Sequence, residues 1–488
     1  MDHPAVLHVM SPLGGGVDRH VRDIVAQVGR RHVLWHVGER AEVLEVEAAR
    51  RYYPLDPGRI AAEPAILAAW LRAMNIGLVH LHTVVRAPRQ RAAWAVQRLG
   101  LPLLVTLHDV LFQRSDAFDY DAPAPEGGWV AELEPVLRSA KAVFAPSDYL
   151  ATLAAGTFPG LEVHVVPNGF APGVSRNAAT LQPRAEFLAH RPARVVAVLG
   201  AIGTHKGADL LRELPAHLEG SGIGIVVIGY LDQQLHPGWK SPPHLYVHGP
   251  YPSERAADLL HAYGAELVLF PNRVPESFSY ALSEAWSAGI PVLAGPGGAI
   301  GERVARHGGG WLLPAGFGAA EVAVELRRRL QPNAAGETAR VRSQLSLPDA
   351  SRVPTLRAMA ESLDAYYRRY GPPAGVPGPA APAAIDALLA PSLDSSLFRQ
   401  ELAVLADLCD ASGAQSKRAR AFEDEARGWI AKLEGDVSTL TQQLTAEVQE
   451  RQRLAGELTA ARAMAQVAER LPPIVKRILA RLARNARR

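Results

Sequence analysis

Two glutamates separated by seven residues stand in a segment that can bind a charged, hydroxyl-rich ligand: Glu276 and Glu284. Residues 267–270 are apolar and predict a strand, and a helix is predicted from near Ser277 to Gly289, because glycine often ends helices. Helical rise places the two carboxylates about 12 Å apart along the axis. This is similar to the span from the sugar to the ribose of a nucleotide-sugar. A helix N-terminus between them would attract a diphosphate.

Three further segments occur at other points of the chain. They are Gly-Gly-Gly-Val-Asp-Arg-His-Val at 14–21, Val-Pro-Asn-Gly at 166–169 and Lys-Gly-Ala-Asp-Leu-Leu at 206–211. Together with the glutamate pair, they resemble the first glycine loop, the interdomain turn, the phosphate-lysine segment and the Glu-x7-Glu motif of retaining GT-B glycosyltransferases of family 4. The resemblance covers roughly residues 5–370. Without the other motifs, a solvated helix face with an acidic N-terminus would explain the two glutamates equally well.

The resemblance implies a role for each residue of the main motif. Glu276 would bind hydroxyls of the transferred sugar, and Glu284 would bind the ribose hydroxyls. The backbone N–H groups of Ser277, Phe278 and Ser279 would face the phosphate and the sugar. Family members often have Pro-Phe-Gly at this point, and the serine-containing version here resembles a subgroup found with surface-polysaccharide synthesis.

The phosphate-lysine segment departs from the family pattern. Lys206 is placed to neutralise the leaving diphosphate, which glycosyl transfer requires. Many family members also have an arginine five residues earlier, where this chain has Ala201. Half of the expected cationic clamp is therefore missing, and we expect His205 or Arg303 to compensate, or the site to be weaker.

The first glycine loop follows a predicted strand. Gly15 and Gly16 would let the backbone approach a phosphate or an acceptor closely, although such a loop also makes an ordinary tight turn. On the next helix, Arg19 and His20 either face the cleft or lie on the surface.

Three histidines end predicted strands. His108, in Thr-Leu-His-Asp at 106–109, resembles the active-site histidine of the family, and the alternative is a hydrogen-bonded structural histidine. We interpret His80 and His82 as structural.

An Asp-x-Asp pair, Asp119 and Asp121, is the one segment that suggests a metal ion. Such pairs hold a divalent cation with a diphosphate in GT-A enzymes. Here prolines and a glycine surround it, and it does not follow a clear strand, so an acidic loop is favoured. We predict no metal and no cofactor besides a nucleotide-sugar donor.

Composition is that of a globular protein kept in a reducing compartment. The chain has 488 residues, 48% of them hydrophobic, a net charge of +3 and a single cysteine, so no disulfide within the chain is expected. No signal peptide and no run of 18 apolar residues is visible. These features predict a cytoplasmic protein, with contact to the inner face of the cell membrane still allowed and no nucleic-acid partner.

Short apolar runs alternate with helical patterns over both halves of the chain, which predicts an α/β protein with two Rossmann-like, doubly wound domains in tandem. A ligand would lie in the cleft between them. The predicted parts are an acceptor domain at 1–180, a nucleotide-sugar domain at 181–350, a crossover helix at 351–370, a Pro/Ala/Gly linker at 371–395, a helical tail at 396–470 and a basic amphipathic helix at 471–488.

The tail suggests two further partners. Apolar residues at a spacing of three and four within 430–458 predict a coiled coil and a homo-oligomer, the alternative being one helix packed on the core. Residues 474–488 combine an apolar face with lysines and arginines, which indicates an anionic membrane surface; the alternative is a solvated basic tail.

These features lead to the hypothesis of a retaining, metal-independent hexosyltransferase that uses a nucleotide-sugar and a glycan or lipid-linked glycan acceptor in cell-surface polysaccharide synthesis. One alternative is a GT-B-like scaffold with weak or no catalysis, suggested by Ala201 and the long tail. A nucleotide-sugar epimerase is another.

Overall fold

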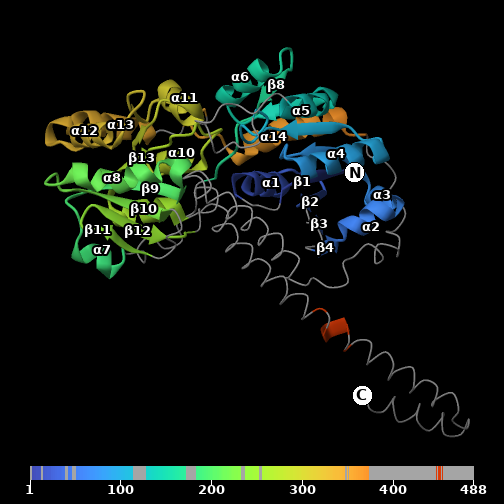
Figure 1. Ribbon diagram of the computed structural model, residues 1–488, viewed down its shortest axis with the longest axis horizontal. Coiled ribbons are helices and arrows are strands. Elements are labelled where there is room, and N and C mark those ends of the chain that lie inside the picture. The colour runs from blue at the N-terminus through green and yellow to red at the C-terminus, as the bar shows by residue number, and fades with distance from the viewer. Residues whose placement is uncertain are drawn as a thin grey trace, which may run out of the picture. The chain divides into compact units, whose positions relative to one another are not determined.

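The structure is a computed structural model (Figure 1). It describes residues 3–11, 15–38, 42–46, 51–113, 128–171, 183–231, 237–251, 255–346, 349 and 351–372, with 447, 449–451 and 453 near the C-terminus. The chain divides into a unit of residues 1–430 and a unit of residues 431–488. The two sheets described below belong to the first unit. The predicted linker lies almost wholly outside the described residues. The predicted coiled coil also lies outside them, apart from a few positions near 450. The predicted basic helix lies wholly outside them.

The first sheet has eight described strands in the order β4-β3-β2-β1-β5-β6-β7-β8. Their bounds are β1 Ala5–Met10, β2 His32–Val37, β3 Glu42–Val46, β4 Arg51–Leu55, β5 Ile76–Leu81, β6 Leu103–Thr106, β7 Ala142–Ala145 and β8 Val163–Val165. The strands β1, β2, β5, β6, β7 and β8 pair in parallel. Nearly continuous apolar runs form these strands because helices cover both faces of such a sheet.

The edge of this sheet differs from the expected all-parallel arrangement. Strands β3 and β4 pair antiparallel, and β3 pairs antiparallel with β2. No strand was predicted over residues 42–46, where β3 contains two buried glutamates. The carboxylate of Glu42 accepts hydrogen bonds from Trp35 and Arg91, and that of Glu45 pairs with Arg22 and His36. Burial of a charge is tolerated when it is paired in this way.

The helices of the first half are α1 Gly15–Gln27, α2 Pro57–Ala62, α3 Pro64–Ala73, α4 Arg86–Leu99, α5 Gly128–Ser139 and α6 Asp148–Thr157. The helices α2 and α3 follow each other with one residue between them. The side chain of Asp56 caps α2 by accepting from the N–H of Gly58 at 2.8 Å, and Pro64 begins α3. Proline favours a helix start because it has no N–H to leave unpaired there.

The second sheet has seven described strands in the order β11-β12-β10-β9-β13-β14-β15. Their bounds are β9 Arg194–Ile202, β10 Ile223–Leu231, β11 Gly238–Ser241, β12 Leu245–Gly249, β13 Ala265–Phe270, β14 Val292–Ala294 and β15 Gly310–Leu312. The edge strand β11 pairs antiparallel with β12, and the others pair in parallel.

Helices cover both faces of the second sheet. Their bounds are α7 Ala185–Ala189, α8 Ala208–Leu218, α9 Ala256–Tyr263, α10 Tyr280–Ser287, α11 Gly298–His307, α12 Ala319–Leu330 and α13 Ala335–Leu345. Apolar residues of α8 and α12 form the core on one face, and those of α9, α10 and α11 form it on the other. This is the doubly wound, Rossmann-like arrangement expected for each half.

The last described helix of the first unit, α14 Leu356–Tyr370, packs on the first sheet although it follows the second in sequence (Figure 1). Its buried Met359, Leu363 and Tyr367 join a core cluster with residues of β1, α1 and β7. The Nε of Arg30 lies 2.6 Å from Oδ1 of Asp364. The chain therefore passes between the two sheets twice. Within the described residues, no helix is long and apolar enough to span a bilayer.

Candidate active site

The segment with the two glutamates connects β13 to α10, and the helix begins later than predicted. It starts at Tyr280 rather than near Ser277, so Glu276 lies in the preceding loop rather than in the first turn. Ser279 explains the difference, because its φ of 70° is outside the helical region. Its hydroxyl accepts from the N–H of Leu282 and so caps the helix. The predicted axial spacing of the two glutamates does not apply to this geometry.

Glu276 lies beside a cation. Its Oε1 is 3.4 Å from Nζ of Lys206 and accepts a hydrogen bond of 2.9 Å from Nδ2 of Asn272. Burial acts to raise the pKa of this carboxyl, but Lys206, Ser279, Asn272 and His205 act in the opposite direction, and the pKa is lowered overall. Glu276 is therefore a carboxylate at neutral pH, able to accept hydrogen bonds from hydroxyl groups.

The backbone of Glu276 lies against the N-terminus of α11. Its carbonyl accepts from the N–H of Ala299 at 2.8 Å. Gly298 has a φ of 70°, and a Cβ there would lie 2.8 Å from the nitrogen of Glu276. Only glycine permits this approach. The glycine pair that follows the motif in sequence thus holds the first glutamate in place.

Lys206 ends a short 3-10 helix, η3 Thr204–Lys206, after β9. The next residue, Gly207, has a φ of 86°, and a Cβ there would lie 2.3 Å from the carbonyl oxygen of Pro271. The carbonyl of His205 accepts from the N–H groups of Arg273 and Val274. These contacts join the lysine segment to the glutamate loop.

Arg303 does not meet the expectation that it replaces the absent arginine at Ala201. Its Nη1 donates to the carbonyls of Phe278 and Ser279, at 2.9 and 3.1 Å. Its Nη2 donates to Ser283 Oγ and to a carbonyl further along the chain, at 2.9 and 3.0 Å. Burial lowers its pKa to about 9, against an opposing effect of Glu276. Arg303 holds the loop before α10, and its terminal nitrogens are used for that.

The second glutamate contacts the first domain. Glu284 is 4% exposed, and its Oε1 lies 2.9 Å from Nη1 of Arg19 on α1. Its Oε2 accepts from the hydroxyl of Tyr251 at 3.4 Å. The guanidinium of Arg19 also lies 4.2 Å from the ring centroid of Tyr280. The carboxylate expected to bind ribose is thus already paired in this structure.

Ser277 also connects the two domains. Its hydroxyl donates to the carbonyl of His108, and its own carbonyl accepts from the hydroxyl of Ser147 at 2.7 Å. Phe278 is 3% exposed and its ring packs against the guanidinium of Arg303, so its side chain is part of the core. Gly16, from the glycine loop, lies against the ring of Tyr280. Gly14, Asp119 and Asp121 lie outside the described residues.

His108 follows β6 and belongs to a cluster of histidines that was not predicted from the sequence. Its Nε2 lies 3.3 Å from Nδ1 of His82, and its ring packs edge-on to His20 with centroids 4.7 Å apart. Burial lowers its pKa, with smaller contributions from His20 and His80. The cluster consists of His8, His20, His32, His80, His82 and His108.

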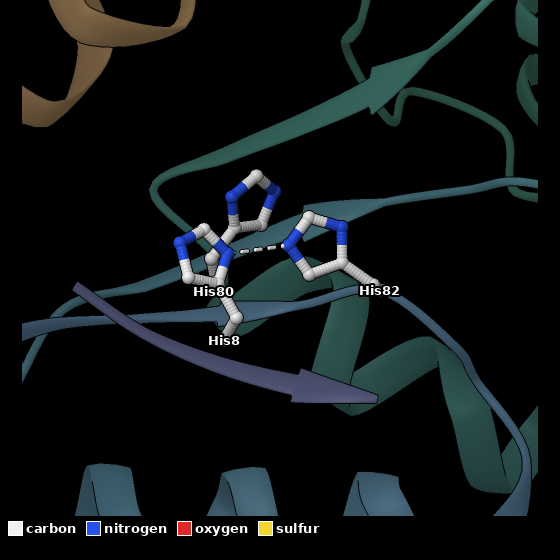
Figure 2. A group of neighbouring side chains, drawn as sticks. All are labelled: His8, His80 and His82. Atoms are coloured by element: carbon white, nitrogen blue, oxygen red, sulfur yellow. Dashed lines mark hydrogen bonds between the residues drawn. The ribbon is translucent and has the colours of Figure 1, made fainter. Parts of the chain in front are cut away.

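The positions of three of these histidines in neighbouring strands do indicate part of the cluster. His80 and His82 alternate on β5 and its end, and His8 pairs with His80 in register on the neighbouring strand β1. Alternate residues of a strand share one face, so the three side chains meet on the same side of the sheet. Figure 2 shows His8, His80 and His82 together, with the hydrogen bond between His8 and His82.

Two Rossmann-like domains joined by an interdomain turn and a returning helix define the GT-B class of protein. The model named Glycosyltransferase Family 4 matches residues 14–173, and the model named Glycosyl transferases group 1 matches residues 183–339. The chain therefore belongs to the GT-B glycosyltransferases of family 4.

Two curated proteins are similar to parts of the chain. A D-inositol 3-phosphate glycosyltransferase of Segniliparus rotundus is 26% identical over 262 residues, which are 49% of this chain and 56% of that protein. A lipopolysaccharide 1,2-N-acetylglucosaminetransferase of Salmonella typhimurium is 27% identical over 176 residues, 33% of this chain and 46% of that one. The chain thus spans about half the length of the curated relatives it matches.

Solved structures share the fold at low sequence identity. Anabaena HepE in complex with UDP and glucose has a TM-score of 0.54 and 16% identity, over 75% of this chain and 100% of that one. A glycosyltransferase from Rickettsia africae has a TM-score of 0.52 and 16% identity, over 75% and 99%. At this identity the likeness shows the GT-B fold alone.

Proposed function

We propose that the protein is a retaining, metal-independent glycosyltransferase that moves a hexosyl residue from a nucleotide-sugar to a glycan or lipid-linked glycan in cell-surface polysaccharide synthesis. The observation that carries this proposal is the contact between the Glu276 carboxylate and Lys206, in the loop before α10. The similar HepE structure was solved with UDP and glucose, which supports a nucleotide-sugar donor. The lipopolysaccharide transferase relative supports a glycan acceptor.

In the proposed mechanism, the residues of the site stabilise the charges that develop on the sugar and on the leaving diphosphate. Glycosyl transfer passes through an oxocarbenium-like state while negative charge grows on the leaving diphosphate. Lys206 would neutralise part of that charge, and the N–H groups at 277–279 would contribute before α10. Glu276 would accept hydrogen bonds from the sugar hydroxyls. His108, whose carbonyl is bonded to Ser277, would orient a hydroxyl from the side of the first domain.

Glu284 would bind the ribose while it remains near the first domain. A carboxylate has about four lone-pair positions, and Arg19 and Tyr251 each use one of them. Donor binding would then strengthen the contact between the two domains.

The test is a donor screen with detection of the product by mass, repeated on Glu276→Gln. We expect the variant to lose about 100-fold or more in kcat/KM, because the neutral amide removes a charged acceptor beside the sugar. Glu361→Gln, on the exposed side of α14, serves as a matched control and should retain activity. Full activity of Glu276→Gln with the true donor would contradict the assignment.

A scaffold without catalysis is the second candidate, favoured by Ala201 and by the full engagement of Arg303. Calorimetry against UDP and a panel of nucleotide-sugars separates the two: absence of any binding favours the scaffold. If the donor sugar is converted without acceptor and a nucleotide-sugar is recovered, the epimerase reading is favoured instead.

We also propose that residues 430–458 mediate homo-oligomerisation and that residues 474–488 bind an anionic membrane surface from the cytoplasmic side. The spacing of apolar residues and the run of basic ones support this. A truncation after Tyr370 should be monomeric and should no longer sediment with vesicles containing phosphatidylserine. A truncated protein that behaves like the full chain in both assays would contradict the proposal.

A further inference from the structure

Three histidine nitrogens meet at the carboxyl ends of the strands of the first sheet. His20 lies on α1, and His82 and His108 follow β5 and β6. Their ligand atoms all lie within 4.8 Å of one another, and the same holds for a second triplet, His8, His80 and His82. Imidazole suits zinc, copper and nickel ions, so each triplet is a candidate metal site. The hydrogen bonds that each triplet already makes indicate which of the two could bind an ion.

The triplet of His8, His80 and His82 (Figure 2) is occupied by its own hydrogen bonds. Nδ1 of His80 lies 2.8 Å from the hydroxyl of Tyr367, and its Nε2 lies 2.8 Å from Oγ1 of Thr106. Nδ1 of His8 is 2.9 Å from Nε2 of His82. A metal ion at this position would have to break at least two of these bonds, so this triplet is a hydrogen-bonded structural group.

A chain of hydrogen bonds sets which nitrogen of His82 carries the proton. The carbonyl of Val28 can only accept, so Nε2 of His32 donates to it, at 3.2 Å. A neutral imidazole has one N–H, so Nδ1 of His32 accepts from Nε2 of His8 at 2.9 Å. By the same reasoning, Nδ1 of His8 accepts from Nε2 of His82. The lone pair of His82 is therefore on Nδ1, which faces His108.

This arrangement of protons requires that the imidazole rings of the cluster are neutral, and burial keeps them so. Burial is the main cause that lowers the pKa of His8 and His82 and takes that of His32 to about 4. Burial also lowers the pKa of His20 to about 3, and a side-chain hydrogen bond with Asn168 acts in the opposite direction. Neutral imidazole is the form that binds metal ions.

The distance between His82 and His108 is long for a hydrogen bond and is compatible with a shared metal ion. Nδ1 of His82 lies 3.3 Å from Nε2 of His108. A typical N–H hydrogen bond measures about 2.9 Å. By contrast, two nitrogens bound to tetrahedral zinc, each about 2.0–2.1 Å from the ion, are separated by about 3.3 Å.

His20 supplies the independent observation. It is 1% exposed, and neither of its ring nitrogens makes a hydrogen bond of normal geometry with the described residues, although the side chain of Asn168 lies near enough to hydrogen-bond with one of them. Leaving a buried polar group unpaired costs about 1–3 kcal/mol. Asn168 is close enough to affect the pKa of His20, so it can satisfy one nitrogen, and ligation requires only the other.

We propose that His20, His82 and His108 form a binding site for one zinc-class divalent cation, with a fourth position left open for water. His8 is not a ligand but orients one. Its hydrogen bond holds the ring of His82 and directs the lone pair of Nδ1 to the ion. The site is separate from the diphosphate position beside Lys206, but it shares His108 with the proposed function, and the inference concerns binding of the ion rather than a step of the transfer reaction.

The test is calorimetric titration of Zn²⁺ into tag-free, chelator-stripped full-length protein, together with the visible spectrum of Co²⁺ added in its place. We expect one equivalent of Zn²⁺ and the absorption bands of tetrahedral Co²⁺ in the wild type. His20→Leu should lose both. Because at most one nitrogen of His20 is hydrogen-bonded, this variant should melt in EDTA close to the temperature of the wild type.

Three further variants sharpen the result. His164→Ala, on β8 and outside the cluster, should bind Zn²⁺ like the wild type. His8→Leu should bind about 10- to 100-fold more weakly, because it frees the ring and tautomer of His82. His108→Ala repeats the test if His20→Leu does not fold. Equal Zn²⁺ binding by the wild type, His20→Leu and His108→Ala would overturn the site, and wild-type affinity in His8→Leu would overturn the role of His8.

Discussion

At the scale of single residues, the site is organised by a few side chains that each hold another in place. Lys206 and Asn272 hold the carboxylate of Glu276, and Arg303 holds the carbonyls of Phe278 and Ser279. The absent arginine at Ala201 is therefore not replaced by Arg303. Lys206 is the cation in contact with Glu276, and the strength of the proposed catalysis depends on it.

Replacement of Lys206 by alanine should reduce kcat/KM by about 100- to 1000-fold, because a charge beside the leaving diphosphate is lost. It should also raise the pKa of Glu276, since Lys206 contributes to lowering it. The acid limb of the pH–rate profile should therefore move to higher pH. Kinetics across pH 4 to 8 measure both effects. Lys141→Ala, at an exposed position, is the control, and an unmoved acid limb would show that the lysine does not act on Glu276.

Arg303→Met should destabilise the protein by about 2–4 kcal/mol, because a buried group with four hydrogen bonds is removed and their acceptors are left unpaired. Urea unfolding measures this loss. Arg357→Met, at an exposed position of α14, should change stability by less than about 0.5 kcal/mol. Similar stability of the two variants would contradict the role given to Arg303.

At the scale of elements, alternation of apolar runs and helical patterns was enough to predict the main helices and the parallel strands of both sheets other than β15. It did not predict the edge strands β4 and β11. Three further features escaped it for physical reasons. Glu42 and Glu45 lie in β3 as buried, paired charges, which a hydrophobic pattern cannot recognise. The start of α10 depends on the positive φ of Ser279. The histidine triplet joins a helix and the ends of two strands far apart in sequence, so no local spacing reveals it.

Gly169→Ala tests how the interdomain turn packs. A Cβ at Gly169 would lie 2.5 Å from Cα of Leu356 and 2.8 Å from the carbonyl oxygen of Thr355, both backbone atoms. We expect a loss of about 1–3 kcal/mol in urea unfolding, the usual cost of overpacking. Gly29→Ala is a matched control, because nothing described lies within 4 Å of its added Cβ. If Gly169→Ala is as stable as Gly29→Ala, the packing argument is wrong.

At the scale of the whole molecule, buried neutral histidines make stability depend on pH. Burial lowers the pKa of all six histidines of the cluster. Unfolded, each has an ordinary pKa near 6.5. As pH falls below about 6.5, the unfolded chain takes up protons that the folded one does not, so the stabilisation present above this pH is lost. The buried carboxyls of Asp23 and Asp109, whose pKa values are raised to about 6, offset part of this.

Each such proton contributes a slope of about 1.4 kcal/mol per pH unit. The free energy of unfolding should therefore fall by several kcal/mol between pH 7 and pH 5, as measured by urea titrations at fixed pH. His20→Leu should lower the slope by about one proton, and His164→Ala should leave the contribution of the cluster intact. Equal slopes for the wild type and His20→Leu would contradict a neutral His20 in the folded protein.

The two passages of the chain between the sheets are fastened to each other. The N–H of Phe170 donates to the carbonyl of Pro354 at 2.8 Å, Phe170 and Thr355 form a parallel bridge, and Gly169 lies against Leu356. Any change in the relative orientation of the two domains would therefore have to bend both connections together at this point. It would also have to break the contacts of Arg19 with Glu284 and of Ser277 with His108.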